Sequence, residues 1–301
     1  MKSLPGLTLV DGCLVANRTG SLIFSVDELF EQREPHSILA WYSLGHLTTN
    51  AVEWNACSVI TGFLNGMSIS VYLGEEGEIA IFDGNNFKVC NRLPQRESDG
   101  PLRGLYILDG TLWAFGTGLQ LYYTKDLMSW NRLEPSEVDE AGLAFSSIES
   151  VSGFSKKEMY CAGWRGWLSI WNEEDWRGIS SPTNLDLYKI NCLPSGQVYS
   201  CGDEGVVIKG RNNRWIVIGN DVTSEKIWGL EEFNGRVFVS TLHFLYEIVE
   251  DNLVEVESVS DTFFPTSMYK LDSCRNVLWS IGEKQLAEFD GKKWSCLIEM
   301  Y

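Results

Sequence analysis

A corner that suits a tight hairpin turn recurs along this 301-residue chain, near positions 12, 66, 110, 157, 196, 235 and 276. Asp-Gly or Asn-Gly occupies several of these corners, as at Asp11-Gly12, Asn65-Gly66 and Asn234-Gly235. Both dipeptides accept the positive φ angles of a two-residue hairpin turn. The chain therefore repeats a unit of about 40 residues, the period typical of architectures built from small stacked units.

Two further turns advance in step with this corner. The second carries a glycine, as at Thr19-Gly20 and Arg165-Gly166, and the third carries an acidic residue before a large side chain, as at Asp290 and Trp294. Stretches such as 167–171 alternate with the period of two that a strand requires, and long helical periods are absent. The pattern predicts an all-β fold, a β-propeller of four-stranded antiparallel blades that forms a single domain over residues 1–301.

The registers indicate seven blades, separated by one long gap after the first. We place the blades at residues 7–35, 56–93, 102–133, 145–178, 185–217, 226–257 and 266–299. Residues 34–55 are interpreted as an insertion between blades one and two, which covers a sheet edge, plugs the ring or forms a contact surface. Six or eight blades stay open if this segment hides or imitates a set of strands.

The third turn of unit three, from Thr124 to Trp130, reads Thr-Lys-Asp-Leu-Met-Ser-Trp. This stretch resembles the Asp-box of BNR and sialidase-like propellers, without the glycine of that motif. The broader pattern resembles bacterial YVTN/BNR-like and WD40-like β-propeller proteins. In those families the Asp-box clamps a hairpin, so the resemblance implies a structural role for Asp126 and no chemistry.

The formal net charge is −17, from 41 acidic and 24 basic residues. This balance argues against nucleic-acid phosphates and anionic membranes as partners. Neither a secretory signal nor an apolar run of membrane-spanning length is evident. The eight cysteines show no C-x-x-C spacing and behave as small apolar residues. We therefore expect a cytoplasmic protein with reduced thiols, monomeric when free.

Acidic residues concentrate in two sets of loops that reach one face of a propeller. One set joins successive blades, and the other joins the second and third strands of a blade. An acidic face of this kind attracts a basic protein partner, and an exposed tryptophan beside an arginine is a typical interface anchor. The predicted protein-binding residues are Glu97, Asp99, Glu137, Asp139, Glu140, Trp164, Arg165, Asp203, Glu204, Asp221 and Glu225.

No motif of an enzyme or a cofactor site is present. The phosphate-binding G-x-x-x-x-G-K-[ST], the metal-binding H-E-x-x-H and the nucleophilic G-x-S-x-G patterns are missing, and the three histidines lack ligand spacing. We expect no catalysis, no metal and no cofactor. Arg18 and Arg165 are interpreted to occupy corresponding turns of blades one and four, which leaves an anion site open.

Three functions fit these observations. The first is a non-catalytic inhibitor that sequesters a basic partner, such as an immunity protein against a polymorphic secreted toxin. The alternative is a BNR or sialidase-like protein that binds or hydrolyses glycans, and the third is an assembly factor similar to the photosystem-stability propellers. A glycan binder requires exposed aromatic residues beside polar groups in a pocket, whereas an inhibitor requires a broad charged face.

Overall fold

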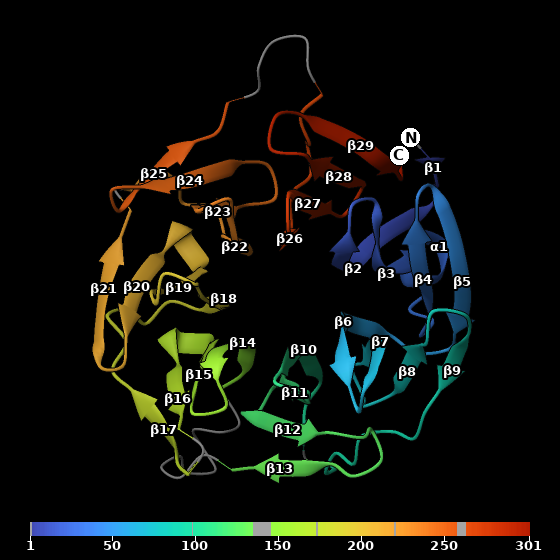
Figure 1. The fold of residues 1–301 in the computed structure, drawn as a ribbon, viewed down its shortest axis with the longest axis horizontal. Helices are drawn as coiled ribbons and strands as arrows, with labels where there is room; N and C mark the ends of the chain where they lie inside the picture. Colours follow the sequence, from blue (N-terminus) through green and yellow to red (C-terminus); the bar gives the residue numbers. More distant parts are fainter. Residues whose placement is uncertain (1, 98, 135–145, 173, 220, 258–262) are drawn as a thin grey trace.

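Seven antiparallel sheets of four consecutive strands surround a common axis (Figure 1). The computed structural model describes residues 2–97, 99–134, 146–172, 174–219, 221–257 and 263–301. In every blade the four consecutive strands follow one another in chain order, from the innermost strand at the axis outward, and one sheet has an additional N-terminal strand at its outer edge. The predicted all-β propeller of seven blades is confirmed.

Each blade consists of four strands joined by short turns. In blades one to four the strands are β2 (Leu7–Ala16), β3 (Thr19–Val26), β4 (Ser37–Ser43), β5 (His46–Val52); β6 (Ala56–Leu64), β7 (Met67–Gly74), β8 (Ile79–Phe82), β9 (Phe87–Val89); β10 (Leu102–Leu108), β11 (Thr111–Gly116), β12 (Gln120–Thr124), β13 (Asn131–Leu133); and β14 (Ile148–Ser155), β15 (Glu158–Gly163), β16 (Leu168–Trp171), β17 (Trp176–Ile179). In blades five to seven they are β18 (Leu187–Cys192), β19 (Val198–Gly202), β20 (Val207–Arg211), β21 (Arg214–Ile218); β22 (Gly229–Phe233), β23 (Arg236–Ser240), β24 (Leu245–Val249), β25 (Asn252–Glu255); and β26 (Lys270–Cys274), β27 (Val277–Gly282), β28 (Gln285–Phe289), β29 (Trp294–Glu299).

Blade one differs from its prediction. Residues 34–55 are not an insertion, because they contain β4 and β5, the two outer strands of this blade. The added segment is instead α1 (Asp27–Glu31) and the loop after it, which lengthen the connection between β3 and β4 and displace the outer strands along the sequence. The expected corner at Asp11-Gly12 lies inside β2, and the chain turns at Arg18, whose φ angle is 51°.

The N-terminal residues close the ring. The short strand β1 (Lys2–Ser3) pairs in parallel with β29 and becomes the fifth strand of blade seven. The Leu4 amide continues this pairing with a hydrogen bond of 2.7 Å to the Glu299 carbonyl oxygen. The two ends of the chain consequently lie side by side (Figure 1).

A buried carboxylate reinforces the closure between blades seven, one and two. Asp11 on β2 accepts a 2.6 Å hydrogen bond from the Lys270 ammonium group of blade seven and a 2.8 Å bond from the Val59 amide of blade two. Asp272 accepts a 2.6 Å bond from the Leu14 amide. Beneath these contacts, fully buried Trp279 packs in an apolar cluster shared by blades seven and one.

The turn that resembles an Asp-box is a local clamp. The Asp126 carboxylate accepts hydrogen bonds of 2.8 Å from the amides of both Met128 and Ser129. Asp83 and Asp290 hold the corresponding turns of blades two and seven in the same way. Backbone hydrogen bonds of this kind favour the ionised carboxyl group, and they lower the pKa of all three aspartates. The role of Asp126 is therefore structural.

Candidate protein-binding site

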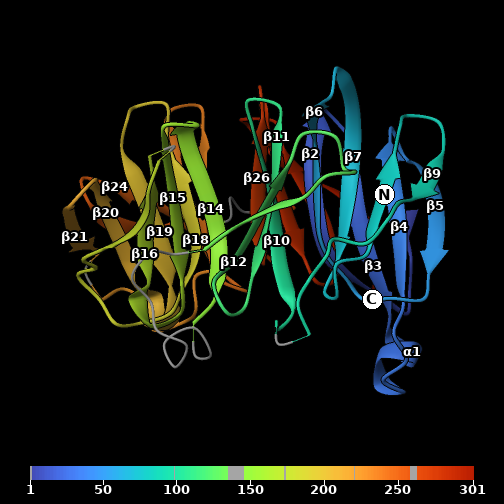
Figure 2. The same ribbon diagram turned by 90° about the horizontal axis from the view of Figure 1, so that it is seen from below.

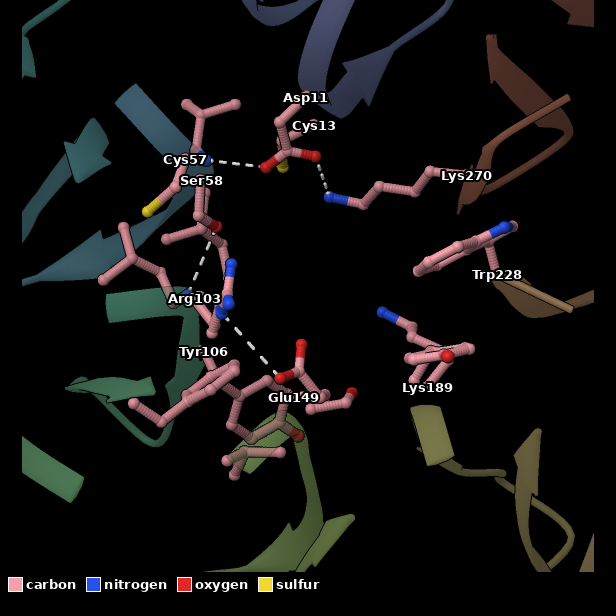
Figure 3. A pocket seen from close by; sticks show the side chains of 18 of the residues that line it. Asp11, Cys13, Cys57, Ser58, Arg103, Tyr106, Glu149, Lys189, Trp228 and Lys270 are labelled. Atoms are coloured by element: carbon pink, nitrogen blue, oxygen red, sulfur yellow. Dashed lines mark hydrogen bonds and ion pairs between the residues drawn. The ribbon is translucent and has the colours of Figure 1, made fainter. Parts of the chain in front are cut away.

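A cavity lies on the propeller axis and has a volume of about 620 Å³. The innermost strands of all seven blades contribute to its lining, namely β2, β6, β10, β14, β18, β22 and β26. Figure 3 shows side chains from several of these strands converging on one space. The cavity therefore exists only when the ring is closed.

A β-bulge directs one side chain of the innermost strand toward the cavity mouth. The strand pairing skips one residue at this place in five blades, for example Tyr188 between the Leu187 and Lys189 pairs. Such bulges re-aim a side chain where a site is needed. The bulged residues, with their counterparts in blades six and seven, are Val10, Cys57, Arg103, Glu149, Tyr188, Trp228 and Tyr269, and all seven line the cavity.

Three of these residues form a continuous aromatic surface, which we call the aromatic shelf: Tyr188, Trp228 and Tyr269. The Tyr188 and Trp228 rings stack with centroids 4.2 Å apart, and the Trp228 and Tyr269 centroids are 5.2 Å apart. All three side chains are half-buried. The Lys226 ammonium group lies 5.4 Å from the Tyr188 centroid and 5.9 Å from the Trp228 centroid. The ammonium group of Lys226 therefore already forms a cation–π contact with the aromatic shelf.

Trp164 belongs to the same mouth. It lies in the short turn η1 (Trp164–Gly166), is half-buried and lines the cavity. The Arg103 guanidinium group is 6.0 Å from its ring centroid and pairs with Glu149 at 3.8 Å. Of the predicted interface residues that the structure describes, Trp164 is the one that lines the cavity.

The cavity wall carries more carboxyl groups than cations. Five carboxyl groups, of Asp11, Glu75, Glu149, Glu231 and Asp272, face three cations, of Arg103, Lys189 and Lys270. Burial raises the pKa of Glu231 to about 8 and also raises the pKa of Asp272. Burial alone would lower the pKa of Lys270, but the carboxylates of Asp11 and Asp272 raise it above its ordinary value. The cavity wall thus holds two more carboxyl groups than cations.

The loops of the predicted binding face lie around this mouth. In blade two the turn residue Glu75 donates an amide hydrogen bond to Asn55 of the preceding loop and accepts one from Leu102 of the following loop. In blade five the Asp203 amide bonds to Asp186 and the Gly202 carbonyl to Ile227. Both sets of loops therefore share one face. The β3–β4 connection with α1 belongs to the same set, and Figure 2 shows α1 projecting beyond the ring.

The predicted protein-binding residues that the structure describes differ in their exposure to solvent. Glu97, Arg165, Glu204 and Asp221 are exposed, whereas Asp203 and Glu225 are half-buried. Glu204 occupies the middle of the turn η2 (Asp203–Gly205) with a φ angle of 50°. Glu137, Asp139 and Glu140 lie outside the described residues.

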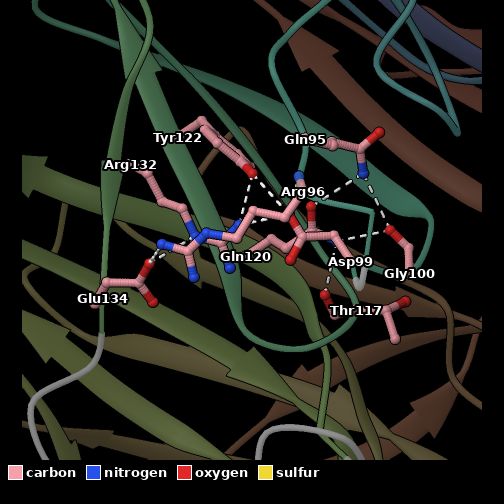
Figure 4. A network of polar contacts seen from close by, with 9 residues as sticks. All are labelled: Gln95, Arg96, Asp99, Gly100, Thr117, Gln120, Tyr122, Arg132 and Glu134. Carbon is pink, nitrogen blue, oxygen red and sulfur yellow. Dashed lines mark hydrogen bonds and ion pairs between the residues drawn. The ribbon is translucent and has the colours of Figure 1, made fainter.

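Asp99 is not the free surface charge that the sequence suggested. Its carboxylate pairs with the Arg132 guanidinium group and accepts hydrogen bonds of 2.9 Å from both the Tyr122 hydroxyl and the Arg96 amide (Figure 4). Burial opposes ionisation of Asp99, but the bonds from Arg132, Arg96 and Tyr122 prevail and lower its pKa. Asp99 therefore stabilises the loop between blades two and three.

Two other predicted acidic residues lie close to basic side chains. Asp203 is 3.4 Å from the Lys226 ammonium group, and Glu225 is 3.8 Å from the His243 ring. An exposed ion pair such as Asp203–Lys226 contributes at most about 1 kcal/mol and is easily exchanged for another. Glu97, Glu204 and Asp221 are the predicted acidic residues that the structure describes as exposed.

The interpretation that Arg18 and Arg165 occupy corresponding turns is wrong. Arg18 lies between the first and second strands of blade one, and Arg165 between the second and third strands of blade four. These turns open on opposite faces, so the two arginines cannot form one anion site. No cluster of three or more metal-binding side chains occurs among the described residues. In the same part of the chain, no helix is long and apolar enough to cross a membrane.

Sequence reasoning missed the aromatic shelf and the cavity carboxyl groups. The available signal was the position in the repeat. The bulged residue, or its counterpart, precedes each hairpin corner by a similar number of residues, as Arg103 precedes Asp109 and Trp228 precedes Asn234. Residue type gave no help, because valine, cysteine, arginine, glutamate and aromatic residues all occur at this position.

A curated relative shares nearly the whole chain. The Immune protein Tsi7 of Pseudomonas aeruginosa (strain PAO1) is 29% identical over 279 residues, which cover 89% of this chain and 90% of the relative. No protein-family model matches the chain. The similarity supports the prediction of an immunity protein.

Solved structures share the fold at low identity. YCF48 bound to D1 peptide superposes with a TM-score of 0.68 at 14% identity and covers 94% of this chain and 92% of that one. The WD40 β-propeller domain of Doa1 superposes with a TM-score of 0.65 at 12% identity, covering 96% and 92%. These likenesses support a propeller of WD40 type, while the resemblance to BNR and YVTN repeats stays a prediction.

Proposed function

We propose that this protein is an immunity protein, which binds a toxin domain through the face that surrounds the cavity mouth and thereby blocks it. The observation that carries the proposal is the similarity to Immune protein Tsi7, because it extends over 89% of this chain and 90% of the relative. Its action is binding without catalysis.

The cavity mouth has the composition of a binding hot spot. Tryptophan, tyrosine and arginine dominate the energetics of protein interfaces, particularly in pockets near the centre of the contact. The mouth presents Tyr188, Trp228, Tyr269, Trp164 and Arg103 on one side of the ring. Charged loops surround them, as expected for a polar rim that excludes water and sets orientation.

The charge of this face favours a basic partner. The exposed carboxylates of Glu97, Glu204 and Asp221 would steer a positively charged domain toward the mouth and accelerate association. We further propose that the free protein is monomeric and acts in the cytoplasm, where a toxin that acts inside cells would have to be met.

The glycan-binding alternative gains one observation from the structure. Aromatic side chains lie beside polar groups in a cavity, which is the arrangement expected of a carbohydrate site. The similarity to an immune protein favours the protein ligand. Saturable binding of a glycan at the shelf, with no protection against any toxin domain, would favour the alternative.

Protection of cells tests the proposed function directly. The chain would be co-expressed with each toxic C-terminal domain encoded beside its gene, and survival would be scored against an empty vector. We expect one such domain to be neutralised, and to co-purify with the chain at equal stoichiometry. Failure of the chain to protect against every neighbouring toxic domain would refute an immunity function.

Reversing the exposed charges should weaken binding of the protective partner. The triple variant Glu97→Lys, Glu204→Lys, Asp221→Lys should lose at least about tenfold in affinity, or roughly 1.4 kcal/mol, because rim charges accelerate association. A basic residue is compatible with the Glu204 turn, because Arg165 has a similar φ angle at the corresponding turn of blade four. Titration calorimetry at two salt concentrations measures the effect.

The matched control is Glu250→Lys, an exposed residue in a turn of the opposite face. It should leave affinity within about twofold of the parent protein, since surface substitutions away from a contact have small effects. An unchanged affinity in the triple variant, without salt dependence, would assign the acidic loops to solubility alone.

A further inference from the structure

The cavity combines two features that each favour a cation. The aromatic shelf presents ring faces, and ring faces attract ammonium and guanidinium groups. Lys226 already uses the outer part of the shelf in this way. Among the residues that line the cavity, five carboxyl groups outnumber three cations by two.

Ion pairs between side chains of the cavity show which of its carboxyl groups already have a cation partner. Lys270 binds Asp11 at 2.6 Å, and Arg103 pairs with Glu149. The amine of Lys189 points into the cavity (Figure 3), where it lies near both Glu231 and Asp272. Lys270 also interacts with Asp272, so Asp11, Glu231 and Asp272 share two cations, those of Lys189 and Lys270. The Glu231–Asp272 side of the cavity therefore holds one more carboxyl group than it has cations.

The Glu231 carboxyl group also accepts weak hydrogen bonds from uncharged side chains. Its carboxyl oxygens accept a 3.1 Å hydrogen bond from the Ser273 hydroxyl and a 3.4 Å bond from the Asn191 side-chain amide. These partners come from β26 and β18, the innermost strands on either side of β22. The acidic group is thus positioned between blades without a strong ion pair, at a wall of the cavity.

We propose that the cavity receives a basic side chain, arginine or lysine, from a projecting segment of the partner, with its stem against the aromatic shelf and its charge directed at Glu231 and Asp272. This inference rests on the proposed function and specifies what the partner presents. The volume of about 620 Å³ is within the range of about 300–1,000 Å³ found for small-ligand sites, so it can admit a short segment around that side chain.

Binding of a cation beside Glu231 should be coupled to the loss of a proton from this residue, which predicts a measurable pH dependence of the affinity. Because the pKa of Glu231 is raised to about 8 by burial, the group is mostly protonated at pH 7. A bound cation favours the ionised form and lowers that pKa, so binding releases a proton. Affinity should therefore rise with pH, by up to about tenfold per unit below pH 8, and level off above it. The charged groups that act on Glu231 are Asp272 from β26 and Lys189 from β18, and Lys270 from β26 lines the same cavity.

The test uses the intact protein and a blocked pentapeptide, acetyl-Gly-Gly-Arg-Gly-Gly-amide. Its control replaces arginine with citrulline, which has nearly the same shape and no charge. Binding would be followed by NMR through the Trp228 indole N–H signal, assigned by its loss in Trp228→Phe. Titrations between pH 6 and 9 would compare the parent protein with Glu231→Gln and with Glu250→Gln, which removes a carboxylate from the opposite face.

We expect the arginine peptide to bind at least tenfold more tightly than the citrulline peptide at pH 8, and to shift the Trp228 signal. Glu231→Gln should weaken this binding and abolish its pH dependence, whereas Glu250→Gln should change neither. The remaining indole signals report whether each variant is folded. Equal binding of both peptides, or no binding of either by a protein that still neutralises its toxin, would overturn the cation proposal and leave the immunity function standing.

Discussion

Replacing Trp228 with alanine is expected to weaken binding of the toxin partner by about 2–4 kcal/mol, a factor of roughly 30 to 1,000. Trp228 stacks on Tyr188 and contacts Tyr269, so its removal disrupts the whole aromatic shelf at the cavity mouth. Large losses of this kind occur where an aromatic residue fills the dry centre of an interface. Calorimetric titration of the purified partner measures the change.

Trp215 provides the matched control for this variant. It is also a half-buried tryptophan, but it lies on β21, the outermost strand of blade five, with its ring against Tyr160. Trp215→Ala should reduce stability without reducing affinity by more than about twofold. If Trp228→Ala binds the partner as tightly as the parent protein, the cavity mouth is not the centre of the interface.

Replacing Lys270 with methionine should lower the free energy of unfolding by about 2–4 kcal/mol. Removing one member of a fully buried ion pair costs about 3–5 kcal/mol, because it leaves a charge without compensation. Asp11 would be left in that state, since its side chain is 8% exposed. The expected loss is somewhat smaller than for a fully buried pair because Lys270 faces the cavity, where water can reach. Urea denaturation measures the difference.

Two further variants distinguish the loss of the buried Asp11–Lys270 ion pair from the effect of replacing a lysine in general. Lys209→Met removes a lysine whose partner Asp251 is at a similar distance, 2.7 Å, but is 44% exposed, so it should cost at most about 1 kcal/mol. Adding Asp11→Asn to Lys270→Met should recover at least about 1 kcal/mol, because the amide oxygen can still accept from Val59 without carrying a charge. Equal losses in Lys270→Met and Lys209→Met would show that the buried pair is not a closure device.

Much of the fold follows from local chemistry. Asn65-Gly66 and Asn234-Gly235 mark hairpin corners because only certain residues accept their φ angles, and both corners appear where expected. Blade one was misread because α1 separates β3 from β4, and the glycine at Gly12 imitated a corner inside β2. Gly12 instead lies in a tightly packed part of β2, where a Cβ atom would meet the Leu22 side chain at 3.0 Å.

The candidate site depends on features that local sequence does not encode. The acidic loops could be predicted from the sequence. The pairing of Asp99 with Arg132 could not, because it joins a loop to a strand, β13, that is distant in sequence. The cavity mouth depends on where strand pairing slips by one residue, as at Tyr188, and on seven blades meeting at one axis. Both are tertiary properties, so the residues that line the mouth looked like ordinary strand residues.

Hydrogen–deuterium exchange of the toxin complex tests most directly whether the mouth-bearing face is the binding surface. The account predicts that partner binding slows exchange in residues 203–205 and 221–229, which include the η2 turn and the approach to Trp228. The turns at 109–111 and 234–236, on the opposite face, should exchange as in the free protein. Protection confined to those opposite turns, with unchanged exchange at the mouth, would contradict it.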